Sequence, residues 1–212
     1  MPIVLNGSGT ITGVSVGGLP DGSVDADTLA ANAVTSGKLA SGVGGKLLQI
    51  VQTIKTDISS FSSVSNGAFV NTDSAFAVTI TPSSTSSLIY LSGFVNVAVS
   101  GAVAQVNINY RRGGADLTTA VDGGSTTSPI GDAAGSRKRV AATGNNTDPA
   151  GNCFTLALLD KPNSTSAQTY SLSLSHGSGS SRNMYINETN GTTDASYSVR
   201  SCSVFIAMEI AA

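Results

Sequence analysis

The 212-residue chain has few of the side chains from which catalytic and metal sites are built. It has no tryptophan, one histidine (His176) and two cysteines (Cys153 and Cys202). Because there is no CxxC or Cys/His cluster, a metal site or a Ser–His–Asp triad has little support. Acidic residues are scattered without a compelling spacing, although a carboxylate pair formed only in space is invisible in a sequence. We therefore expect no enzymatic activity, no cofactor and no bound metal.

Charged residues are equally scarce, at 11% of the chain with a net charge of −2. This balance indicates no attraction to nucleic acid or to an anionic membrane. No run approaches the roughly twenty apolar residues of a membrane span, and the N-terminus lacks the basic and apolar regions of a signal peptide. We expect synthesis in the cytoplasm and no membrane insertion. Low charge also favours burial of surface against sister subunits; the plainer interpretation is a neutral surface rich in serine and threonine.

The residues that are abundant, namely small ones with Val, Thr and Asn, favour short strands and tight turns over a helical bundle. After Gly45 we expect strands at 46–57, 75–81, 88–99, 103–111, 152–159, 168–175, 183–188 and 202–210, with turns at 59–66. These strands predict an antiparallel β-sandwich head over residues 46–212. A jelly roll is the first choice and a simpler sandwich the second.

Alternation within the strands predicts the core of the head. Apolar residues at every second position of 168–175 indicate a half-buried strand, and the last strand closes the sheet. We expect the core to contain most of Tyr170, Leu172, Leu174, Phe205, Ile206 and Met208. In 88–99 apolar residues occur at both odd and even positions, so both faces of the strand are apolar. This is typical of a strand covered on both faces, here by the core and by a subunit interface. Cys153 and Cys202 lie in predicted strands, and two buried free thiols are expected unless those strands are neighbours.

The N-terminal 45 residues have a different pattern. Their large apolar residues lie five apart, at Val24, Leu29, Val34 and Leu39. This spacing suits neither a single helix nor a strand, and cap-type residues interrupt the run, so we predict two short helical turns at 26–31 and 35–39. Such turns have too little apolar surface to be stable alone. We therefore predict an extended arm, residues 1–45, whose four large apolar residues meet the same stretch of sister chains.

The arm also has a recognisable phrase. The segment GTITGVSVGGLPDGSVDADTLAANAVTSGKLA, and within it AVTSGKLASG, resembles a segment near the N-terminus of many bacteriophage tail-fibre and virion appendage proteins. The chain's end, SVFIAMEIAA, is similar to the closing strand of phage fibre heads. The resemblance implies a homotrimeric virion protein that docks by its arm onto other virion proteins and binds the host surface through its head. Such a protein is assembled in the host cytoplasm and located in the virion.

The longest predicted loop, 112–151, contains the basic cluster Arg137, Lys138 and Arg139. Loops of this length on a rigid scaffold are usually functional or disordered. A solvated loop is one interpretation, and contact with an acidic host glycan, another receptor or a sister subunit is the other. A capsid decoration protein is the alternative to a tail fibre, because the chain lacks a long shaft. A depolymerase is a third class, but the head is too short for a β-helix.

Overall fold

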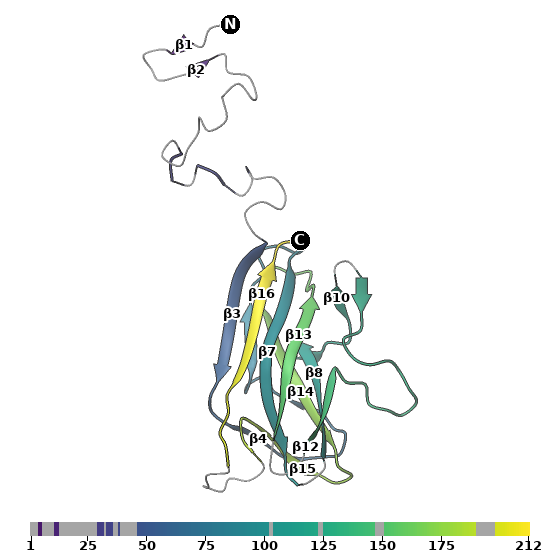
Figure 1. The fold of residues 1–212 in the computed structure, drawn as a ribbon. Helices are drawn as coiled ribbons and strands as arrows, with labels where there is room; N and C mark the ends of the chain where they lie inside the picture. The colour runs from purple at the N-terminus through teal and green to yellow at the C-terminus, as the bar shows by residue number, and fades with distance from the viewer. Residues whose placement is uncertain are drawn as a thin grey trace. The chain divides into compact units, whose positions relative to one another are not determined.

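The structure is a computed structural model that describes residues 4–5, 11–12, 29–31, 33–35, 38, 46–101, 104–122, 125–146, 151–189 and 198–212 (Figure 1). The chain divides into two units, Met1–Gly45 and Lys46–Ala212. In the first unit β1 (Val4–Leu5) pairs with β2 (Ile11–Thr12) in an antiparallel hairpin. Two single-turn hydrogen bonds follow, from Ala33 N to Ala30 O and from Lys38 N to Thr35 O, each 2.9 Å long.

The second unit, called the head below, contains two antiparallel sheets. The first sheet has the order β3 (Leu47–Lys55), β16 (Ser203–Ile210), β7 (Leu88–Val99) and β13 (Asn152–Asp160). The C-terminal end of β7, which β16 does not reach, pairs with β15 (Arg182–Ile186), and β15 pairs in turn with β4 (Ser59–Val64). The second sheet has the order β6 (Ala77–Ile80), β14 (Gln168–Gly177), β8 (Ala104–Arg112) and β12 (Ala142–Asn146), with β5 (Val70–Asn71) on β14 and β9 (Ala115–Asp116) on β8. A separate hairpin joins β10 (Ala120–Asp122) to β11 (Ser125–Thr127).

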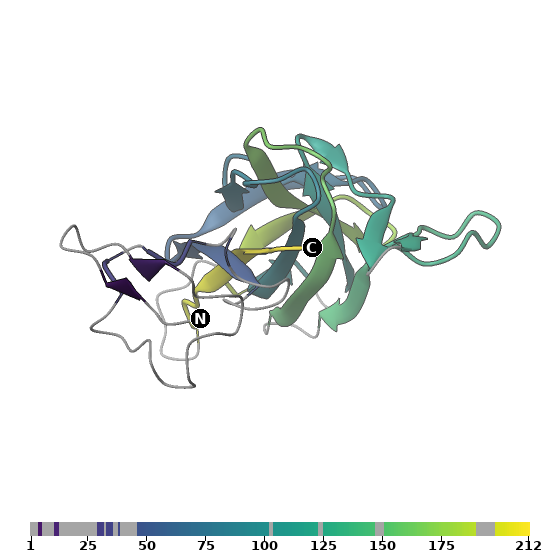
Figure 2. The same cartoon turned by 90° about the horizontal axis from the view of Figure 1, so that it is seen from above.

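The connections show how the two sheets form one sandwich. Along the chain the long strands pass from β3 in the first sheet to β6 in the second, back to β7, then to β8 and β12, and then through β13, β14 and β16 in alternate sheets. This alternation is the connectivity of a jelly roll. The prediction of a mainly antiparallel β-sandwich is confirmed, and Figure 2 shows the sandwich end-on, with the 128–141 loop extending away from it.

The core lies between the two sheets. Tyr170, Leu172 and Leu174 on β14 are fully buried, as their alternation predicts. Phe205 on β16 is also buried, and its ring centroid lies 5.6 Å from that of Phe76, which precedes β6 in the facing sheet. Ile206 and Met208, by contrast, are only half-buried. Because side chains alternate along a strand, burial of Phe205 turns its neighbours to the outside. The prediction that most of the six residues lie in the core is confirmed, with Ile206 and Met208 as the exceptions.

Three local predictions are also corrected. The predicted turn at 59–66 contains β4, a strand that pairs with β15 despite its serines. The predicted loop at 112–151 contains β12, which pairs with β8 from Ala142 to Asn146. Both cysteines are free, as expected, but they are exposed rather than buried. For β4 and β12 the position of a neighbouring strand, which local composition does not encode, decides the outcome.

Candidate subunit interface and partner-binding face

The outer face of the first sheet is apolar. Its outward side chains form three rows that cross β3, β16, β7 and β13 in register. The rows are Ile50–Met208–Tyr90–Leu159, Gln52–Ile206–Ser92–Ala157 and Ile54–Val204–Phe94–Thr155. We call these twelve residues the apolar face. None of them is charged, and only three are polar.

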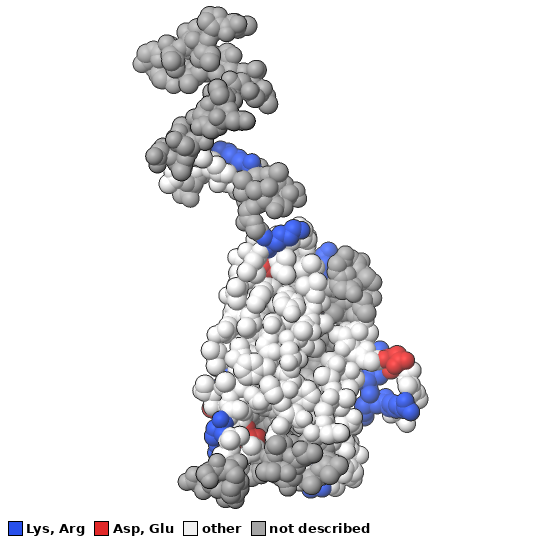
Figure 3. Space-filling model, in the orientation of Figure 1, with Lys and Arg blue, Asp and Glu red and all other residues white. Residues whose placement is uncertain are grey.

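This surface is open in the single chain. Ile50 is 56% exposed and Ile54 is 55% exposed, and next to them Leu47 and Leu48 are exposed by 52% and 48%. In Figure 3 the face in front of these strands is a continuous uncharged surface. Full burial of one such side chain contributes about 1.5–3 kcal/mol, and contiguous apolar surface of this kind marks an interaction site.

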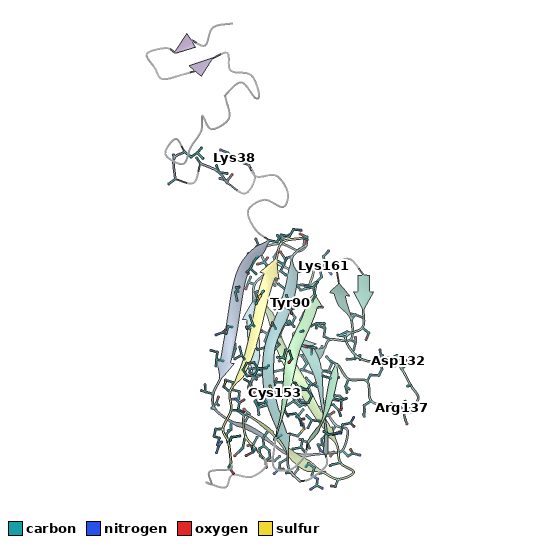
Figure 4. All side chains as sticks on the ribbon, in the orientation of Figure 1. Lys38, Tyr90, Asp132, Arg137, Cys153 and Lys161 are labelled. Atoms are coloured by element: carbon teal, nitrogen blue, oxygen red, sulfur yellow. The ribbon has the colours of Figure 1, made fainter. Side chains whose placement is uncertain are left out.

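The two cysteines border the apolar face. Cys153 on β13 lies opposite Asn96 on β7, and Asn96 Nδ2 donates a 2.6 Å hydrogen bond to Cys202 O (Figure 4 labels Cys153). The two thiols thus lie on either side of β7 and are not bonded to each other.

The outer face of the second sheet is polar and is covered by the head's own loops. Asn107, Asn109 and Arg111 on β8 pair with serines on β14, and all three are buried. Ala141 N donates a 2.8 Å hydrogen bond to Asn109 Oδ1, which holds the end of the 128–141 loop against this face. The two sides of the head therefore differ in chemistry, because the first is uncharged and open whereas the second is polar and is held against the head's own loops.

Arg111 is the centre of an ion-pair network on the polar side. Its guanidinium contacts Asp73 Oδ1 at 3.0 Å and Asp116 Oδ1 at 2.7 Å, and it also donates to Gly114 O. The hydrogen bond from Arg111, helped by one from Ser171, lowers the pKa of Asp73 below its usual value. This network fastens the segments that carry Asp73 and Asp116 to the second sheet.

The three basic residues predicted as a receptor contact have different environments. Arg139 Nε donates to Gly131 O at 2.5 Å and Arg139 Nη2 to Ser128 Oγ at 3.2 Å, so this side chain ties the two ends of the 128–141 loop together. Arg137 and Lys138 are exposed, and among the described residues neither side chain has a hydrogen bond or ion pair.

A hollow of about 440 Å³ lies beside Arg137 and Lys138. Its polar lining comes from the side-chain amides of Asn66, Gln105 and Asn107. None of the lining residues is acidic. Of the three predicted contact residues, Arg137 and Lys138 thus line the same hollow. The side chain of Arg139 is instead hydrogen-bonded within the loop.

The residues predicted to form an interface in the arm are only partly described. Leu29 is 44% exposed and Val34 is 49% exposed, and nothing in the first unit covers them among the described residues. Val24 and Leu39 lie outside the described residues. The predicted subunit interface on one face of 88–99 includes Tyr90, Ser92 and Phe94 of the apolar face, but the sequence prediction includes no residue of β3 or β13. Residues 203–210 have the same two-sided apolar pattern, which the sequence analysis interprets as core.

The buried ionisable groups of the head are used in packing. Asp160 is fully buried, and its Oδ2 accepts hydrogen bonds from Arg112 Nη1 at 2.5 Å and from Tyr170 Oη at 2.7 Å. Burial, together with the Asp160 carboxylate, raises the pKa of Tyr170. Within the described ranges there is no group of three or more metal-binding side chains. The same part of the chain contains no helix of the length and hydrophobicity required to cross a membrane.

Comparison with known proteins supplies no family. No family model and no curated protein matches the chain. Among solved structures, the chain is similar to VP2 of infectious bursal disease virus in its subviral particle, at 13% identity and a TM-score of 0.39, over 77% of this chain and 37% of VP2. It is also similar to a Bacillus endospore appendage protein from disulfide-linked pili, at 14% identity and a TM-score of 0.30, over 82% of this chain and 98% of that one. The chain thus spans little more than a third of the length of VP2, and likenesses this distant carry no argument about function.

Proposed function

We propose that this protein is a structural component of a bacteriophage virion, a homotrimeric tail fibre or appendage without enzymatic activity. Its arm, residues 1–45, docks onto other virion proteins, and its head contacts the host surface. The proposal rests on one structural observation, the apolar face, together with the resemblance of the arm's AVTSGKLASG phrase to phage appendages.

The occupant of the apolar face is a second copy of this chain. An uncharged face has no like-charge repulsion against copies of itself, so copies of this face can meet around a common axis. It also lacks the charge pattern that would select a different partner. The polar outer face of the second sheet, which its own loops already cover, then points away from the assembly. The number three comes from the resemblance to trimeric appendages.

Light scattering of the full chain tests the oligomeric state, with three protomers as the expected result. Ile54→Glu should convert the trimer to monomer at micromolar concentration, because it buries one carboxylate per subunit without a partner. The matched control is Thr79→Glu, which adds the same charge on β6 of the other sheet and should leave the trimer intact. Ile54 is exposed in the single chain, so the variant should still fold. A monomeric wild type contradicts the proposal, and a trimeric Ile54→Glu variant contradicts the assignment of the apolar face.

Incorporation into particles tests the role of the arm. The head forms a unit separate from the first 45 residues. Deletion of residues 1–44 should therefore abolish incorporation into particles and leave a folded head, as judged by circular dichroism. Entry of the truncated head into particles would place docking in the head instead.

A capsid decoration protein is the second candidate, because an arm that docks onto other virion proteins suits a capsid shell as well as a tail. Gold labelling of the chain in intact particles separates the two, because a fibre is labelled on the tail and a decoration protein over the shell.

A further inference from the structure

We propose that the hollow beside Arg137 and Lys138 binds an anionic saccharide. The inference deepens the proposed host-surface contact, because it assigns a site and a ligand class to the head. The site lies on the polar side of the sandwich, away from the apolar face that the proposed trimer covers.

The first argument is an uncompensated positive charge. Arg139 is held within the loop by Gly131 O and Ser128 Oγ, whereas Arg137 and Lys138 form no ion pair within the described residues. Asp132 on the same loop is not among the residues that line the hollow (Figure 4 labels Asp132 and Arg137). Elsewhere on the head Arg111 and Arg112 are held by aspartates, whereas Arg137 and Lys138 leave two adjacent positive charges without a carboxylate beside the hollow.

The second argument is the surrounding chemistry. Asn66, Gln105 and Asn107 add amide donors and acceptors, which suit the hydroxyl groups of a sugar. Arg and Lys bind carboxylate and phosphate groups through charge-assisted hydrogen bonds. A volume of about 440 Å³ falls within the range of small-ligand sites, roughly 300–1,000 Å³. A saccharide with one acidic substituent uses both sets of groups.

The third argument is that the site is anchored. Asn107 is only 5% exposed, and its Nδ2 lies 3.3 Å from Ser175 Oγ on the neighbouring strand. Gln105 Nε2 donates to Thr143 Oγ1 at 2.9 Å. The backbone N–H of Gly67 donates to His176 O at 2.8 Å, and a Cβ at Gly67 would lie 3.2 Å from Lys138 Cε. The lysine stem therefore lies close against a turn that this backbone hydrogen bond holds in place.

Binding to immobilised oligosaccharides tests the proposal with the full chain. Three sets are compared, namely uronate-bearing, phosphate-bearing and neutral oligosaccharides of equal length. Retention on either charged set at least tenfold above the neutral set is expected, and the set that is retained identifies the anionic group. Retention should fall as salt is raised, because the contact is charge-assisted. Equal retention on all three sets, or none, overturns the proposal.

Single-charge variants locate the site. Arg137→Ala and Lys138→Ala should each lower binding at least tenfold, whereas Lys161→Ala, which removes one charge elsewhere on the head, should leave it unchanged (Figure 4 labels Lys161). If Lys161→Ala lowers binding as much as Lys138→Ala, the effect is general charge and the site is wrong. Light scattering and particle incorporation are measured on the same variants. Trimers that enter particles but bind no charged oligosaccharide contradict this inference alone, whereas loss of the trimer in the wild type contradicts the proposed function.

Discussion

Glu209 on β16 allows a sharp test of how the end of the sandwich is held. The side chain is 1% exposed, and its carboxylate accepts four hydrogen bonds. Oε1 accepts from Ser83 N at 2.6 Å, Ser83 Oγ at 2.6 Å and Ser87 Oγ at 2.7 Å, while Oε2 accepts from Gln49 Nε2 at 2.6 Å. Burial alone would raise the pKa, but the hydrogen bonds from Ser83, Gln49 and Ser87 outweigh it and lower the pKa of Glu209 to about 2.

The expected cost of Glu209→Gln follows from this pKa. An unfolded glutamate has a pKa of about 4.3, so the gap of about two pH units corresponds to about 3 kcal/mol of folding free energy. Because the folded pKa lies below the unfolded one, this contribution is fully present above pH 4.3 and is lost as the pH falls toward 2. A glutamine at this position loses the charge and turns an amide donor toward groups that are themselves donors. We therefore expect a loss of about 3 kcal/mol at pH 7.

Urea unfolding of wild type and Glu209→Gln at several pH values measures this difference. Both proteins are compared at the same concentration, because assembly adds to apparent stability. The difference in unfolding free energy should shrink to about half near pH 3 and vanish near pH 2. Asp132→Asn, which neutralises an exposed carboxylate of the 128–141 loop, is the control and should have no effect at any pH. A difference below about 0.5 kcal/mol at pH 7, or one that does not change with pH, refutes the argument.

Three further substitutions test the packing of the head by thermal or urea unfolding. Leu172→Ala removes a fully buried side chain and should cost about 2–5 kcal/mol; a cost below about 0.5 kcal/mol means that this strand register is wrong. Gly93→Ala should cost more than about 3 kcal/mol, because φ is +128° and a Cβ would lie 2.1 Å from a backbone oxygen of β16. Its control, Gly113→Ala, has a φ of +58° with open space around it and should cost only about 1–2 kcal/mol; equal costs would show that contact with β16 is not the cause. Arg112→Met leaves the buried Asp160 without its cation and should cost about 3–5 kcal/mol, and the cost should fall when Asp160→Asn is present.

The sequence alone determined the kind of head that this protein has. Strict alternation in Tyr170, Leu172 and Leu174 allows only one face of that strand to enter a core, and the structure buries all three. Apolar residues at both odd and even positions of 88–99 likewise predict a strand with two apolar faces. In the structure one face of β7 enters the core and the other carries Tyr90 and Phe94 of the apolar face. Such patterns are local, so they can be interpreted without knowing which strands are neighbours.

Only the tertiary structure decided which face of a strand enters the core when both of its faces are apolar. Residues 203–210 are apolar on both parities, and the register against β3 and β7, not composition, buries Phe205 and turns Ile206 and Met208 outward. β12 lies within a stretch whose glycines and asparagines predict a loop, and it is a strand because β8 offers it a free edge. The three adjacent basic residues are chemically alike, yet Arg139 donates a hydrogen bond to the carbonyl oxygen of Gly131 within the loop. Arg137 and Lys138 instead lie beside the hollow. Each of these outcomes depends on contacts that exist only once the chain has folded.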